Sequence, residues 1–397
     1  MAAIVAKCGG GSKKRKCEGL GEMHDDVLER VLARLPPASY FRLRGVCRRW
    51  SDAASSPTFL AACGRVNSRD PWFLMLSEGQ EQEQERCRRR PAVAFDAGEG
   101  AWARCGGVPG HVMPVAASGG RVLYRAADTG ALTVANPLTG VSRVLPAPPA
   151  APGALHAVAM YGSSPYRVVL ITGELPDLSM TVFDSSKNAW EDAVALSRKP
   201  EASSPEREAE AGVGGGDETV YFLSKSGDVM ATNMQRSASR QYSSVVTCGD
   251  GGDAVAYFLS HSGAVVACDL SRRVFTELPR ILPVYFEYSI DVVACGGRAY
   301  VVVLSELLGT ASLRLWEFAG GAWRQVAAMP PSMSHAFHGK KADVNCVGHG
   351  DRVMVCEAIG RLLVRAKNGV QGVIVKALSK WKQEEHIHYH QFTTNLE

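Results

Sequence analysis

The chain has 397 residues, of which 46% are hydrophobic and 21% are charged, so it has enough apolar side chains to bury a large core. Its formal net charge of +4 is too small to indicate nucleic-acid binding by itself, and no apolar stretch approaches the roughly 18 residues of a membrane span. The 11 cysteines are scattered without a C-x-x-C pair, which argues against a zinc finger or a thioredoxin-like site and indicates reduced thiols in a cytosolic or nuclear protein.

Residues 1–22 are predicted to form a disordered basic arm. A short apolar patch is followed by Lys13, Lys14, Arg15 and Lys16 beside three glycines, an order that is wrong for a secretory signal. A basic run of this length is typical either of a nuclear-import signal or of a solvated terminal segment. We therefore expect the protein in the nucleus and/or the cytoplasm.

Residues 23–65 are predicted to be helical. Asp25 or Asp26 is suited to cap a first helix, and five apolar residues then recur at helical spacing: Val27, Leu28, Val31, Leu32 and Leu35. Pro36 and Pro37 end this helix. Ser39 is expected to begin a second helix that runs to Trp50, and Ser56-Pro57 a short third turn. A module of about 40 residues without a disulfide or a metal usually needs a partner. Packing on a second domain of the same chain is the alternative.

The stretch "DDVLERVLARLPPASYFRLRGVCRRW" resembles the F-box. The motif positions present are Asp26, Leu28, Leu32, Leu35, Pro36, Arg44, Cys47, Arg48, Arg49 and Trp50. The family's opening Leu-Pro is replaced here by Met23-His24, a departure that weakens the motif at its start. The resemblance implies a small all-α module that binds a Skp-type adaptor, and through it a cullin and a RING protein. It places the following residues at the adaptor: Met23, His24, Val27, Leu28, Val31, Leu32, Leu35, Pro36, Phe41, Arg44, Val46, Cys47 and Trp50.

After residue 70 the apolar pattern alternates, as in β-strands. A strand, a polar turn and a strand with an aromatic residue recur, with the aromatic at Trp102, Trp190, Phe275 and Trp323. Trp102 to Arg143, Arg143 to Trp190 and Phe275 to Trp323 are each separated by about 40–50 residues, the period expected of four-stranded propeller blades. The tryptophans are expected where one sheet packs on the next. A β-sandwich is the alternative architecture.

Together, the helical motif and the repeats resemble plant F-box/kelch-repeat proteins, and the HAWAIIAN SKIRT-like group in particular. The resemblance runs from Met23 to about Cys356. It implies a mainly β chain, with a small all-α F-box at residues 23–65 and a kelch-type β-propeller at residues 70–365. In that family the propeller is the receptor for a protein substrate.

Residues 366–397 depart from the repeat and are predicted to be an atypical polar tail. The last blade is then either incomplete or closed by the strand from Trp72 to Leu76. His386, His388 and His390 alternate, as ligands on one face of a strand do, but no cysteine or carboxylate pattern accompanies them. A polar tail is preferred to a metal site.

Three classes of function are compatible with this organisation. The first is the substrate-recognition adaptor of an SCF-type ubiquitin ligase, which has no chemistry of its own. The alternative is a non-catalytic kelch scaffold whose F-box is weakened at Met23-His24. A propeller enzyme is disfavoured because the chain has no G-x-S-x-G, Walker or H-E-x-x-H motif, and His335 and His338 are its only paired candidates. We expect no cofactor, no metal, no nucleic acid and no membrane, with an unknown protein substrate as the second partner.

Overall fold

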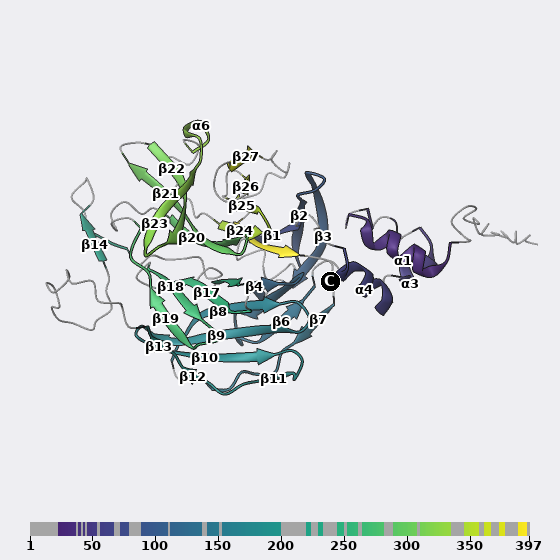
Figure 1. The fold of residues 1–397 in the computed structure, drawn as a ribbon, viewed down its shortest axis with the longest axis horizontal. Helices are drawn as coiled ribbons and strands as arrows, with labels where there is room; N and C mark the ends of the chain where they lie inside the picture. Colours follow the sequence, from purple (N-terminus) through teal and green to yellow (C-terminus); the bar gives the residue numbers. More distant parts are fainter. Residues whose placement is uncertain are drawn as a thin grey trace, which may run out of the picture. The chain divides into compact units, whose positions relative to one another are not determined.

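The computed structural model describes residues 23–36, 39–40, 43, 46–53, 56–66, 72–78, 89–109, 112–136, 141–150, 153–199, 220–223, 229–232, 244–249, 252–260, 264–281, 289–307, 310–334, 345–356, 361–366, 373–377 and 388–394. Two compact units make up the chain: Met1–Ser68 with Glu397, and Arg69–Leu396. The first unit contains helices and the second contains the sheets (Figure 1).

The helical unit contains α1 (Asp25–Arg34), α3 (Arg48–Ala53) and α4 (Pro57–Gly64). The α4 helix begins as its sequence predicts, since the Ser56 hydroxyl accepts a hydrogen bond from the backbone N–H of Thr58 and Pro57 occupies the first turn. The α1 helix ends before Pro36, with Leu35 in an extended conformation, which confirms the predicted stop.

Six sheets, here called blades 1 to 6, make up most of the second unit. Blade 1 contains β28 (His388–Thr394), β1 (Trp72–Glu78), β2 (Arg89–Asp96) and β3 (Ala101–Pro109). Blade 2 contains β4 (Val112–Ser118), β5 (Arg121–Ala126), β6 (Leu132–Ala135) and β7 (Ser142–Val144). Blade 3 contains β8 (Leu155–Gly162), β9 (Tyr166–Glu174), β10 (Asp177–Asp184), β11 (Ala189–Trp190) and β12 (Val194–Ala195).

The second half of the unit continues in chain order. Blade 4 contains β16 (Ser244–Cys248), β17 (Ala254–Leu259), β18 (Val265–Asp269) and β19 (Val274–Glu277), with β13 (Ser197–Arg198) added in parallel beside β19. Blade 5 contains β20 (Ser289–Cys295), β21 (Arg298–Leu307), β22 (Thr310–Ala319) and β23 (Ala322–Ala328), followed by the short α6 (Pro331–Ser334). Blade 6 contains β24 (Asn345–His349), β25 (Arg352–Cys356), β26 (Arg361–Ala366) and β27 (Val373–Ala377). A separate ribbon pairs β14 (Val220–Leu223) with β15 (Val229–Thr232).

The six sheets form a closed ring. One end strand of each sheet contacts the end strands of the two neighbouring sheets, in the cyclic order β28, β4, β8, β16, β20, β24 and back to β28. Most strands that are successive in the chain pair antiparallel within a blade, as in a meander, and β28, β12 and β13 are additions to this pattern in blades 1, 3 and 4 (Figure 1). A ring of such sheets buries both faces of each sheet against its neighbours, which is the logic of a β-propeller. The prediction of a mainly β propeller is confirmed.

Ring closure differs from the prediction. The expected polar tail contains β28, which pairs with β1 over seven residues from Trp72↔Thr394 to Glu78↔His388. The last blade is not incomplete, because β26 and β27 give blade 6 its third and fourth strands. The strand from Trp72 to Leu76 does take part in closure, but within blade 1. The prediction of a polar tail outside the propeller was wrong. The strand β28 pairs with β1, which comes from the other end of the β unit, and no local sequence pattern indicates this pairing.

The recurring aromatic residues occupy equivalent places in the fourth strands. Three of them pair across the hairpin with an aromatic of the third strand: the ring centroids are 4.9 Å apart for Phe95–Trp102, 5.3 Å for Phe183–Trp190 and 5.1 Å for Phe318–Trp323. The fourth, Phe275, pairs with Cys268 instead. The Trp190 indole N–H donates to the carbonyl of Pro146 in blade 2 (2.9 Å), and that of Trp323 donates to the carbonyl of Pro279 in blade 4. These tryptophans therefore join neighbouring blades, as the sequence predicted.

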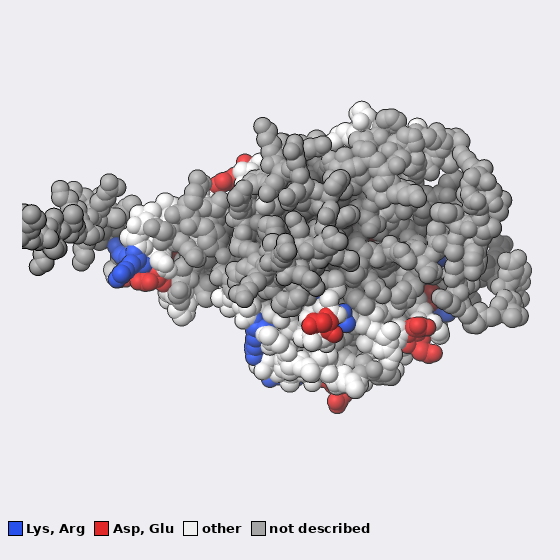
Figure 2. All heavy atoms as spheres, turned by 180° about the vertical axis from the view of Figure 1, so that it is seen from behind, with Lys and Arg blue, Asp and Glu red and all other residues white. Residues whose placement is uncertain are grey.

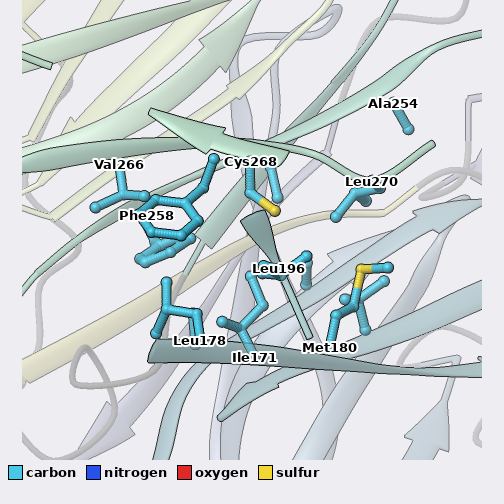
Figure 3. Packing of buried hydrophobic residues seen from close by; sticks show 14 residues of the cluster. Ile171, Leu178, Met180, Leu196, Ala254, Phe258, Val266, Cys268 and Leu270 are labelled. Carbon is cyan, nitrogen blue, oxygen red and sulfur yellow. The ribbon is translucent and has the colours of Figure 1, made fainter. Parts of the chain in front are cut away.

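Apolar side chains fill the space between blades. Between blades 3 and 4, Ile171, Leu178 and Met180 face Phe258, Val266 and Cys268, and all are at most 4% exposed (Figure 3). Hydrogen bonds add to this packing: the Ser244 hydroxyl donates to the Val158 carbonyl across the same junction (2.7 Å). The propeller is thus held by blade-to-blade contacts around the ring.

Candidate functional site

The candidate site begins with α1 of the helical unit. His24 is the N-cap residue, with extended backbone and no side-chain capping bond, so the prediction that Asp25 or Asp26 caps this helix was wrong. Both aspartates lie in the first turn instead, where their charges are favourable at the positive end of the helix dipole. The His24 Nδ1 atom lies 2.7 Å from Asp26 Oδ1. A hydrogen bond from the backbone and the bond with His24 hold the pKa of Asp26 below its ordinary value.

One face of α1 holds the helical unit together. Leu28 and Leu32 are 1% exposed and pack with Phe59 and Cys63 of α4. Tyr40 stacks on Phe59, with ring centroids 5.2 Å apart. The two leucines had been predicted at the adaptor, and the structure places them in the unit's own core, directly beneath the surface that α1 presents.

The other face of α1 carries exposed apolar side chains. Val27 and Val31 are 47% and 44% exposed, and one helical turn separates them on the same side of α1. Val46, just before α3, is 57% exposed. Among the described residues, five large hydrophobic side chains are classed as exposed, and three of them are these valines. We call Val27, Val31 and Val46 the exposed valine set. Such a concentration in a small unit is typical of a protein-binding surface.

An ion pair ties α3 to the start of α1. The Arg49 guanidinium donates to Asp25 Oδ1 (2.9 Å from Nε) and to the backbone carbonyl of Met23. Twenty-four residues separate Arg49 from Asp25, so the sequence pattern placed Arg49 in the motif without predicting this pair. The pair fixes the segment at which the chain departs from the family's Leu-Pro.

The remaining predicted adaptor residues lie around this surface. Met23, Leu35 and Trp50 are partly buried against the core of the helical unit, so the methionine takes an apolar place there. Pro36 and His24 are exposed, and Cys47 is half-buried. Trp50 belongs to α3, so the predicted single helix from Ser39 to Trp50 was wrong: the helix is interrupted at Val46 and Cys47. Phe41 and Arg44 lie outside the described residues.

A metal site and a membrane-spanning helix are the other features that the sequence raised. No group of three or more histidine, cysteine, aspartate or glutamate side chains within the described part of the chain is arranged to hold a metal ion. Of the histidines considered above, His388 and His390 lie on β28, whereas His335, His338 and His386 fall outside the described residues, as does the basic run at residues 13–16. Over the ranges that the structure covers, no helix has the length and apolarity of a membrane-crossing segment.

Charges of the described residues are mixed on one face of the molecule. On the face drawn in Figure 2, acidic and basic side chains of the described residues lie near one another instead of gathering by sign. Buried thiols are also poorly suited to chemistry, because burial raises the pKa of Cys268 to about 12 and that of Cys295 to about 11. The exposed valine set is therefore the feature that calls for a partner.

Comparisons with known proteins agree with this location. The F-box domain model matches residues 20–61. F-box only protein 13 of Arabidopsis thaliana is 42% identical over 353 residues, which cover 85% of this chain and 74% of that protein. F-box only protein 6 of Arabidopsis thaliana is 28% identical over 178 residues, covering 43% of this chain and 36% of that protein. An F-box/kelch-repeat protein of the same plant is 46% identical over 56 residues, 13% of each chain.

Proposed function

Because this chain belongs to the F-box protein family, whose members are non-catalytic subunits of ubiquitin ligases, we propose that it is the substrate-recognition adaptor of an SCF-type cullin–RING complex. The helical unit binds a Skp-type adaptor, which connects the chain to the cullin and the RING protein. The propeller binds a protein target for ubiquitination and degradation. The identity of the target is set by surfaces of the propeller and not by the F-box.

The observation that carries this proposal is the exposed valine set. Leu28 and Leu32 fill the core of the helical unit, so the fold of this unit does not use the outer face of α1. Val27 and Val31 then remain on that outer face at 47% and 44% exposure, within the segment that matches the F-box. Burying such side chains against a partner is worth about 1.5–3 kcal/mol each at full burial. A protein-binding role for this face explains why Val27 and Val31 are exposed to solvent.

Capture of a Skp-type adaptor by the full-length chain tests the proposal. We expect the double variant Val27→Asp/Val31→Asp to lose at least tenfold in adaptor co-purification, because two charges replace apolar contacts in the interface. The matched control is Val141→Asp/Val144→Asp in blade 2, whose valines are 70% and 67% exposed and should leave adaptor capture unchanged. Full capture by the α1 variant would overturn this docking face.

A scaffold with a weakened F-box is the competing function. It rests on the Met23-His24 departure, and against it stands the partial burial of Met23 on the core of the helical unit, which is the role of an apolar residue. If the unmodified chain captures no Skp-type adaptor, the scaffold is favoured. If it does capture the adaptor, proximity labelling identifies targets: proteins that accumulate with Val27→Asp/Val31→Asp and not with the parent chain are degradation substrates.

Finer assignments are part of the same proposal. The propeller is of the kelch type and the chain belongs to the HAWAIIAN SKIRT-like group; the aromatic repeat and the similarity of 56 residues to an F-box/kelch-repeat protein support this. The protein acts in the nucleus and/or the cytoplasm, which the basic run at residues 13–16 supports. Its partners are proteins, and neither nucleic acid nor a membrane is needed.

A further inference from the structure

The ribbon β14–β15 repeats the sequence of the central hairpin of blade 4. Residues 215–233 read GGDETVYFLSKSGDVMATN, and residues 251–269 read GGDAVAYFLSHSGAVVACD. The two segments align without a gap at an offset of 36 residues, and 11 of the 19 positions are identical (G, G, D, Y, F, L, S, S, G, V and A). The chain therefore contains two copies of one hairpin.

The two copies also have the same strand register. In the ribbon the pairs are Tyr221↔Ala231, Phe222↔Met230 and Leu223↔Val229. In blade 4 the pairs are Tyr257↔Ala267, Phe258↔Val266 and Leu259↔Val265. Each pair of the ribbon becomes the corresponding pair of blade 4 when 36 is added to both numbers. Five residues connect the strands in both copies, so the two hairpins match in sequence length and in strand register.

Their surroundings differ. The copy in blade 4 has β16 on one side and β19 on the other, and its Phe258, Val266 and Cys268 are buried against blade 3 (Figure 3). Among the strands that the structure describes, β14 and β15 pair only with each other, and β14 lies apart from the strands of blade 4 in Figure 1. A two-stranded hairpin alone is marginally stable in water. The β14–β15 ribbon thus has the sequence of the central hairpin of a blade, but it does not lie within a blade.

We propose that β14–β15 can replace β17–β18 as the central hairpin of blade 4, so that this blade has two alternative arrangements. The connection allows the exchange. Eleven residues, 233–243, join β15 to β16, and an extended chain of that length spans roughly 36 Å. Returning along a five-residue strand requires only about 17 Å. Residues 249–273 then leave the ring as a loop between β16 and β19.

Differences at three positions explain why β17–β18 holds the place in the unmodified chain. Ala256, Val266 and Cys268 are 0% exposed in blade 4. The ribbon has Val220, Met230 and Thr232 at the equivalent register positions. Larger side chains overpack a filled core, and the threonine brings a hydroxyl into it. Exchange within one chain is favoured over exchange between chains, because the tethered copy has the higher effective concentration.

Aspartate substitutions in the full-length chain test the exchange. Val266→Asp puts a charge at a fully buried site of the resident hairpin, and Met230→Asp does the same at the equivalent position of the ribbon. We expect Val266→Asp to keep a cooperative melt at a lower temperature, with protection from hydrogen exchange moving from residues 254–269 to residues 220–232. The control, Met230→Asp alone, should melt like the parent, and the double variant should lose the cooperative transition.

Two results would overturn the proposal. If Val266→Asp alone loses the cooperative transition as fully as the double variant, or keeps it without any gain of protection at residues 220–232, the ribbon does not replace the blade hairpin. If the protection moves but Val266→Asp elutes as a dimer whose population rises with concentration, the exchange occurs between chains and the intramolecular form is wrong. A monomer with transferred protection supports it.

Discussion

Glu317 and three aspartates lie at the same distance in sequence from the aromatic of the fourth strand, but their carboxylates bind different groups. Asp96, Asp184 and Asp269 lie six residues before the aromatic of the fourth strand, and their carboxylates accept hydrogen bonds from backbone N–H groups of the following turn. Glu317 lies six residues before Trp323, but its hairpin is shorter, since Ala319 pairs with Ala322. Glu317 binds Arg298 (2.7 Å) and Arg324 (2.8 Å) instead. The acidic residue thus recurs at the same spacing from the aromatic in all four blades. The length of the turn determines whether its carboxylate binds backbone N–H groups or arginine side chains.

The two arginines make the stability of blade 5 depend on pH. Burial acts to raise the pKa of Glu317, but the hydrogen bonds from Arg324 and Arg298 outweigh burial and hold the pKa below its usual 4.5. A carboxyl group whose pKa is lowered on folding stabilises the fold above its unfolded pKa, and this contribution is lost as pH falls through the folded pKa. Glu317→Gln should therefore lower the free energy of unfolding by about 1–2 kcal/mol at pH 7.

Denaturant unfolding at several pH values measures this effect. The difference between parent and Glu317→Gln should shrink as pH falls below 4.5, where the parent loses its charge as well. Glu191→Gln is the control, because Glu191 is 46% exposed and lies 3.9 Å from Lys187, a surface pair that contributes little. A constant difference across the pH range would show that Glu317 acts through packing alone.

At the scale of elements, the fourth strands were predictable because their signal is local. An aromatic pair across a tight hairpin needs only a few successive residues, so Trp102, Trp190 and Trp323 identify β3, β11 and β23 from sequence. The helical unit was less predictable. Gly45 directly precedes the interruption at Val46 and Cys47, but the apolar periodicity runs on to Trp50 and predicted one continuous helix. The F-box motif placed the exposed valines, but not the Arg49–Asp25 pair.

Substitutions in the Phe183–Trp190 pair can distinguish the contribution of core packing from that of the inter-blade hydrogen bond. Phe183 is 0% exposed, and Trp190 packs on it while donating to Pro146 of the neighbouring blade. Trp190→Phe keeps the ring but loses the donor, so it should cost about 0.5–1.5 kcal/mol. Phe183→Ala empties a core site and should cost about 3–5 kcal/mol. Thermal and urea unfolding distinguish the two, and equal losses would mean that the inter-blade hydrogen bond dominates this junction.

At the scale of the whole molecule, closure of the ring could not be read from the sequence. The strand β28 comes from the polar end of the chain, "HYHQFTT", and gains its place by pairing with β1. It also contacts β24 of blade 6 and β4 of blade 2, so it joins both ends of the ring. A side-chain pattern reports a buried face but not which distant strand completes a sheet. The closing strand was therefore predicted as a tail.

Removing residues 388–397 tests this closure. Without β28, the edge of β1 loses its seven-residue partner and blades 2 and 6 lose a neighbouring strand. We expect the free energy of unfolding to fall by at least about 3 kcal/mol, or the cooperative melt of the β unit to disappear, because lost strand pairing and exposed apolar faces add together. Removing residues 1–22 is the matched terminal truncation and should leave that melt unchanged, since those residues belong to the other compact unit. A propeller that melts like the parent after losing residues 388–397 would mean that the ring is held by blade-to-blade packing and does not need its closing strand.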